Sequence, residues 1–214
     1  MLFRSLELDP DNRRLSRQFR RRLDAEALRD TLLALSGTLD RTVGGSLLET
    51  KNGEYVTNDQ SSNAARYDAP RRSLYLPIIR NAMLDLYSSF DYPDPSVTVE
   101  ARPETTSASQ ALYLMNSPLA LATARALVAR SRGATTDAER VEALYRGVLS
   151  RAPSAAERER ALRFVAAARG PGGACAGADV GRPNDPPADP ELDARAWRAL
   201  AQVLVVSSEV LYVD

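Results

Sequence analysis

Residues 105–130, TTSASQALYLMNSPLALATARALVAR, constrain the fold of this 214-residue chain more than any other stretch. Ser107 and Gln110 have the spacing of a capping box, which predicts the start of a helix that ends at Met115. The Asn-Ser-Pro sequence at 116–118 predicts a corner, and the helix after it has a contact face of small residues. Two helices broken at a fixed corner need other elements to cover both of their faces.

Other segments show the apolar spacing of amphipathic helices. Residues 23–35 predict one such helix, and Gly37 ends it. Two more capping boxes, Thr136 with Glu139 and Ser154 with Glu157, begin the next helices. A last helix begins at Asp189-Pro190 and carries four core residues on one face, namely Trp197, Leu200, Ala201 and Leu204. A shorter helix is expected at 82–90, and another from Asp9-Pro10 through the arginine-rich run at 13–22.

Short β elements are predicted between these helices. The Asn-Gly pair at 52–53 favours a hairpin, because a type I′ turn needs positive φ at both central residues. Residues 74–79 predict an edge or irregular strand, since Pro77 cannot donate a ladder hydrogen bond, and residues 97–101 predict a strand that pairs with it. The predicted fold class is mainly α, a multi-helix domain with a small β-hairpin or short-strand excursion. Residues 1–214 are expected to form a single domain, with a flexible Gly/Ala/Pro-rich loop at 170–190.

Composition argues against several functional classes. The 28 basic and 28 acidic residues balance, so no overall field favours nucleic acid, and we predict no nucleic-acid partner. Histidine is absent and Cys175 is the single cysteine, which removes the commonest general base, nucleophile pairs and metal ligands. We therefore expect no cofactor and no metal. No transmembrane segment or signal peptide is recognisable, so the chain itself does not give a localisation.

The candidate catalytic residues are Asp91 and Asp94, the nearest approach to a pair of carboxylates. In a proline-rich turn, such residues more often accept hydrogen bonds from backbone or arginine groups, and that interpretation is favoured.

The candidate binding residues surround the same region: Arg71, Arg72, Arg80, Arg102, Thr105, Gln110 and Asn116. Converging arginines would clamp a sulfate, phosphate or carboxylate, whereas the alternative is ion pairing with Asp91, Asp94 or Glu104. The capping box accounts for Gln110 and the helix corner for Asn116, so neither requires a ligand.

Four stretches carry a resemblance to a known family: RRLDAEALRDTLLALSG from Arg21, RRSLYLPIIRN from Arg71 running into FDYPDP, TTSASQALYLMNSP from Thr105, and the closing SSEVLYVD. Together they resemble the planctomycete-specific domain of unknown function 1553. The resemblance implies a C-terminal domain of large bacterial, extracytoplasmic proteins that carry a cytochrome-c-like module upstream. It also implies that this chain is truncated at its N-terminus.

Two functional hypotheses follow. The first is a non-catalytic interaction or scaffold module that binds protein partners, either an upstream domain or a neighbouring redox or polysaccharide-processing protein. The alternative is part of a hydrolase-like enzyme acting on an anionic or polysaccharide substrate, with Asp91, Asp94 and Arg102 as acid, base and anion clamp. The two differ in geometry, because the enzyme needs both carboxylates to point into one pocket.

Overall fold

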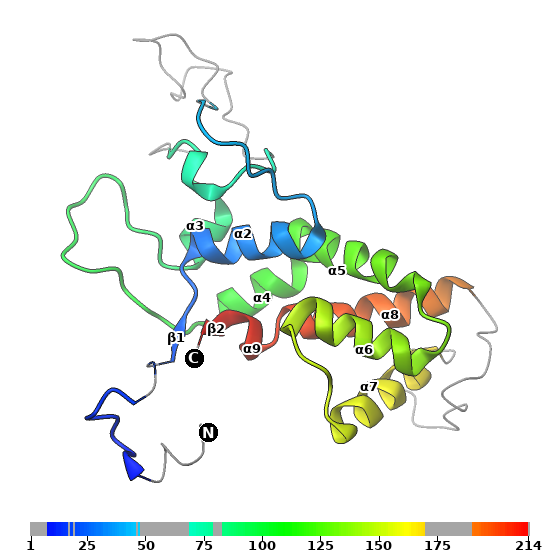
Figure 1. The fold of residues 1–214 in the computed structure, drawn as a ribbon. Helices are drawn as coiled ribbons and strands as arrows, with labels where there is room; N and C mark the ends of the chain where they lie inside the picture. The colour runs from blue at the N-terminus through cyan, green and yellow to red at the C-terminus, as the bar shows by residue number, and fades with distance from the viewer. Residues whose placement is uncertain are drawn as a thin grey trace.

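The computed structural model describes residues 8–16, 18, 20–45, 47, 69–78, 83–169 and 190–213. Across these residues the chain is mainly helical with one small antiparallel sheet, which confirms the predicted fold class. Three helices form the centre: α2 (Ala25–Ser36), α5 (Pro118–Arg130) and α8 (Pro190–Val205). Helix α5 packs against both α2 and α8, so it is the central element of the core (Figure 1).

Helix α5 can contact two neighbours because its buried face is small. Ala120 and Ala124 are buried there, beside Leu127 and Val128. The Thr123 hydroxyl, fully buried, lies 3.1 Å from the Leu32 carbonyl of α2 and 2.9 Å from the Leu119 carbonyl of its own helix. The small-residue face predicted for this helix is therefore its packing surface.

Helix α4 (Ala108–Asn116) precedes the predicted corner. Both halves of its capping box, between Ser107 and Gln110, are present. Ser117 accepts a hydrogen bond from the Ala120 amide and Pro118 is the first residue of α5, so the corner is fixed by local chemistry. The two helices are bent by 51° at this break.

In the described part of the chain no single helix is long and apolar enough to span a membrane. The bent pair of α4 and α5 has the necessary length and apolar composition only when the two helices are counted as one segment.

Helices α6 (Asp137–Leu149) and α7 (Ala155–Ala168) start at the two capping boxes predicted from sequence, and α7 covers α8. Arginines fix their ends to other elements. Arg169, after α7, pairs with Asp137 of α6 and Asp193 of α8, each at 2.6 Å. Arg151, between α6 and α7, pairs with Glu157 at 2.8 Å and Glu209 at 2.6 Å.

The sheet lies where none was predicted. Strand β1 (Arg21–Arg22) pairs antiparallel with β2 (Tyr212–Val213), which follows the short helix α9 (Ser208–Leu211). The predicted helix through residues 13–22 is therefore wrong. Asp9 does accept hydrogen bonds from the amides of Arg13 and Arg14, but they close only a turn. The end of the arginine run is extended because the C-terminal residues supply it with a partner strand (Figure 1).

The strand predictions at 74–79 and 97–101 are also wrong, since neither residues 74–78, the described part of the first, nor residues 97–101 form a strand. The first begins as a 3₁₀ turn, η1 (Ser73–Tyr75), because Asp30 of α2 accepts hydrogen bonds from both the amide and the hydroxyl of Ser73. Residues 97–101 form an irregular exposed segment that pairs with no strand in the described residues. Helix α3 (Asp85–Ser89) is a shorter version of the helix predicted at 82–90.

Some predicted features fall outside the described residues. These are the hairpin at 52–53, Arg80, residues 170–189 of the predicted loop with Cys175, and Asp189 before α8.

Candidate functional site

The first candidate site is a hydrogen-bonded network around Asp91. Arg22, the last residue of β1, donates from Nη2 to Asp91 Oδ2 at 2.6 Å and from Nη1 to the Thr105 carbonyl. Asp91 also accepts from the Thr105 amide at 2.9 Å and from its hydroxyl at 2.7 Å. Gln110 donates to the Thr105 carbonyl at 3.1 Å. The network closes the long segment between α3 and α4 and fastens it to β1.

The electrostatics of Asp91 match this structural role. Burial acts to raise its pKa, but hydrogen bonds from Arg22 and from the backbone and hydroxyl of Thr105 outweigh it, so the pKa is lowered. A lowered pKa keeps the carboxylate charged and makes it a poor proton donor. Asp94 is exposed and accepts a hydrogen bond from the Ser96 amide at 2.8 Å, as in an Asx turn.

Those predicted binding residues that the structure describes contact several different protein groups. Arg71 donates to the carbonyls of Thr42 and Gly44, at 2.8 and 2.6 Å, and lies over the ring of Tyr75. Asn116 donates to the Leu112 carbonyl one turn back in its own helix.

Arg102 binds Glu26 through two hydrogen bonds of 2.7 and 2.8 Å. Ion pairs were the predicted alternative to a ligand, and they form with partners other than the predicted ones. Arg102 pairs with Glu26, and Asp91 pairs with Arg22 instead of Arg71, Arg72 or Arg102.

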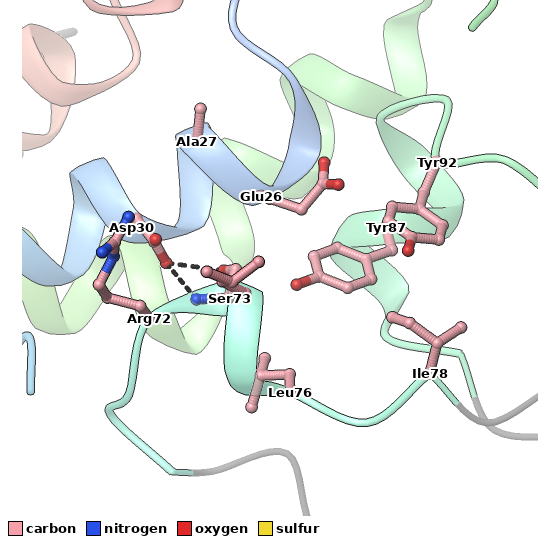
Figure 2. Close-up of a pocket in the computed structure, with 10 residues that line it drawn as sticks. Glu26, Ala27, Asp30, Arg72, Ser73, Leu76, Ile78, Tyr87 and Tyr92 are labelled. Carbon is pink, nitrogen blue, oxygen red and sulfur yellow. Dashed lines mark hydrogen bonds between the residues drawn. The ribbon is translucent and has the colours of Figure 1, made fainter. Parts of the chain in front are cut away.

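The second candidate site is a pocket of about 320 Å³ between α2, η1 and α3, and Arg72 is one of the residues that line it (Figure 2). One wall is the face of α2 that carries Glu26, Ala27 and Asp30. The opposite wall comes from residues 72–78, and the aromatic rings of Tyr87 and Tyr92 close the third side. Figure 2 shows the Asp30 carboxylate bonded to Ser73 between these walls and the Tyr87 hydroxyl directed toward Ser73.

The charged groups at the pocket are mostly compensated. Burial acts to raise the pKa of Glu26, but the hydrogen bond from Arg102, a backbone hydrogen bond and the charge of Arg102 together outweigh it and leave this pKa lowered. Asp30 accepts through Oδ1 from the Ser73 amide at 2.8 Å and from its hydroxyl at 2.7 Å. Arg29, buried behind this wall, lies 3.8 Å from the same oxygen.

The two tyrosines form a stacked pair. Their ring centroids are 4.7 Å apart with an interplanar angle of 11°, and the Arg102 guanidinium lies over the Tyr92 ring at 5.3 Å. Tyr87 is fully buried, and within the part of the chain that the structure describes its hydroxyl has no hydrogen-bond partner of good geometry. Burial raises the pKa of this phenol, although Ser73 and Arg29 act in the opposite direction.

Sequence reasoning missed Arg22 and most of the pocket. Glu26 and Asp30 have the i, i+4 spacing that places two side chains on one helix face, which was the available signal. Tyr87 is an aromatic residue that the sequence places in the core or at a rim, but the hydrogen bonding of its phenol depends on tertiary packing and has no signal in the sequence. Within the described residues no group of three acidic or cysteine side chains could hold a metal ion.

The fold and the two sites define a helical domain whose candidate acids serve as hydrogen-bond acceptors in its structure. The chain belongs to the family described as protein of unknown function DUF1553, whose model matches residues 3–165. That match ends within α7, so α8 and the C-terminal strand, which complete the core, follow the matched region. No curated protein and no solved structure matches the chain.

The stretches that carry the family resemblance meet in space. Those starting at Arg21, Arg71 and Thr105 supply the Asp91 network or the pocket walls, and the closing stretch forms β2 beside β1. Tyr87 is the pocket residue that lies outside all four of them.

Proposed function

We propose that this chain is a non-catalytic protein-interaction module that contacts its partner at the pocket between α2, η1 and α3. The observation that carries the proposal is the apolar rim of this pocket. Leu74 is 74% exposed and Ile78 is 36% exposed, and both line the opening. Apolar surface beside a pocket favours association, because a bound partner removes that surface from water.

The acids near the pocket support binding more than hydrolysis. A glycosidase-like mechanism needs a carboxyl group with a raised pKa as general acid. Glu26 and Asp91 both have lowered pKa values, because arginines donate hydrogen bonds to them. Asp94 is exposed in its own turn and does not line the pocket.

The aromatic groups do not favour a polysaccharide either. A sugar-binding platform needs a free ring face on which the sugar can stack. Tyr87 is fully buried against Tyr92, and Arg102 lies over the Tyr92 ring. The partner is therefore a protein in our proposal, either an upstream domain of a larger chain or a neighbouring redox or polysaccharide-processing protein.

Site-specific photo-crosslinking tests this proposal. A photoreactive phenylalanine analogue placed at Leu74 should yield a crosslink to one protein in native extract. That protein, once purified, should bind the unmodified chain. The same analogue at Val203, an exposed residue of α8, is the matched control.

The proposal is supported if the purified partner binds and is crosslinked from position 74 but not from position 203. Equal yields from both positions would mean non-specific contact and would overturn it. So would the absence of any crosslink from a chain with the parent's circular dichroism spectrum and melting temperature.

A further inference from the structure

We infer that the pocket binds an extended, uncharged peptide segment of the partner, with one peptide group inside and an aliphatic side chain against the rim. The inference rests on the proposed function, because it names the partner chemistry for that same site.

Two polar groups at the pocket have unused hydrogen-bonding capacity. The Tyr87 hydroxyl is buried and, although Ser73 lies close to it, makes no hydrogen bond of good geometry among the described residues, which is costly unless a ligand supplies one. Both hydrogen bonds that Ser73 makes to Asp30 end on Oδ1, and Oδ2 accepts none among the described residues. A peptide group has one N–H donor and one carbonyl acceptor, so it can donate to Asp30 Oδ2 and accept from Tyr87.

The charges favour a neutral segment. A cation in the pocket would face Arg72 at the rim and Arg29 behind Asp30, while an anion would face Glu26 and Asp30. Arg102 already compensates Glu26. A charged ligand would therefore lose its hydration without gaining a matching field.

The size and lining of the pocket fit one side chain with its peptide group. A volume of about 320 Å³ lies at the small end of ligand pockets. The buried Leu76 and the exposed Leu74 and Ile78 offer an apolar surface for an aliphatic side chain. The hydrogen bonds would hold the main chain and the rim would select the side chain.

An NMR titration of the full chain with small blocked amino acids tests the inference. The probe is N-acetyl-leucine N-methylamide, followed through the backbone amides of Ala27 and Ser73. Saturable shifts at these two positions are expected. N-acetyl-leucine methyl ester, which replaces one N–H donor by oxygen, should bind about tenfold more weakly if Asp30 accepts that hydrogen. The corresponding lysine and glutamate amides should both bind more weakly than the leucine amide.

Two variants locate the binding. Tyr87→Phe removes only the hydroxyl and should weaken binding of the leucine amide several-fold, while its melting temperature stays at or above that of the parent. Tyr145→Phe, on α6 and outside the pocket lining, is the matched control and should bind as the parent does. Ala27→Leu, at an exposed position of α2, should fill the pocket and abolish binding in a folded chain.

The inference is overturned if the leucine amide gives no saturable shifts, if the ester binds equally well, or if a charged amide binds more tightly. It is also overturned if Tyr87→Phe or Ala27→Leu binds as the parent does. Crosslinking from position 74 without peptide binding would leave the proposed function standing and defeat this inference alone. Peptide binding without any captured protein would overturn the proposed protein partner and leave only the peptide-binding chemistry of the pocket.

Discussion

Arg22 and Asp91 are 69 residues apart in the sequence, yet Nη2 of the first lies 2.6 Å from Oδ2 of the second. Their side chains are only 8% and 15% exposed. The pair joins β1 to the turn after α3, and Thr105 extends it to the segment before α4. A short and largely buried ion pair that joins separate segments of the chain is expected to stabilise the fold.

Replacing Arg22 by Leu should lower the free energy of unfolding by about 1–3 kcal/mol, because it removes a charge-assisted hydrogen bond and leaves the half-buried carboxylate of Asp91 without its cation. Urea denaturation followed by circular dichroism measures this. Arg163→Ala is the control, since Arg163 and its partner Glu159 are 66% and 69% exposed, and such a pair contributes at most about 1 kcal/mol. A loss at Arg22 no larger than the loss at Arg163 would mean that the Asp91 network does not stabilise the fold.

The acid stability of the chain should depend on Glu157. Hydrogen bonds from Arg151 and from the Ser154 backbone lower the pKa of this carboxyl from 4.5 to about 2. Because the folded-state pKa lies below the unfolded one, the stabilisation is present above pH 4.5 and is lost as the pH falls toward 2.

Glu157→Gln should therefore lower the melting temperature at pH 7 and flatten its decline between pH 4.5 and pH 2. Asp91 and Glu209, whose pKa values are also lowered, should maintain the remaining slope. Thermal melts across this range provide the measurement, with Glu159→Gln as the control, because its ion pair is exposed to solvent. Parallel curves for the Glu157 variant and the parent would contradict this prediction.

The features that were predicted correctly from the sequence are those that depend on contacts between residues close together in the chain. Each capping box joins residues three apart, and the signal for a helix start therefore lies within one turn. The αL residue at Gly37 and the corner at 116–118 are local in the same sense. These features were correct because no distant contact was needed to form them.

The sheet and the pocket depend on contacts across the chain. Arg21 and Arg22 belong to a run whose helical interpretation was locally reasonable, but their partners are Val213 and Tyr212. The apolar run after Ser73 looked like a strand, and only the contact with Asp30 makes it a 3₁₀ turn. Arginine composition alone was uninformative, although Arg22 joins Asp91 to the Thr105 carbonyl and Arg29 holds the carbonyls of Ala69 and Arg71 against α2.

Gly37 should not tolerate a side chain, although the space around it is open. Its φ is +79°, and the nearest atom to an added Cβ would be Nη1 of Arg130 at 3.9 Å. Gly37→Ala should therefore cost about 1–2 kcal/mol through backbone conformation alone. Gly133→Ala is the control, because that glycine lacks a positive φ and has nothing within 4 Å of the added Cβ. Equal unfolding free energies for the two variants would rule out conformational strain at Gly37.

The stability of the chain should depend on side-chain size on only one face of α5, the face that packs against α2 and α8. Ala124 is 2% exposed in the core that α5 shares with α2 and α8, whereas Ala122 of the same helix is exposed. Ala124→Leu should destabilise the chain by about 1–3 kcal/mol, because the added isopropyl group must displace well-packed neighbours. Ala122→Leu adds the same atoms to solvent and should change stability by less than about 0.5 kcal/mol. If chemical denaturation showed equal losses for both, the effect would come from helix propensity, and the small-residue face would not be what positions α5 between its two neighbours.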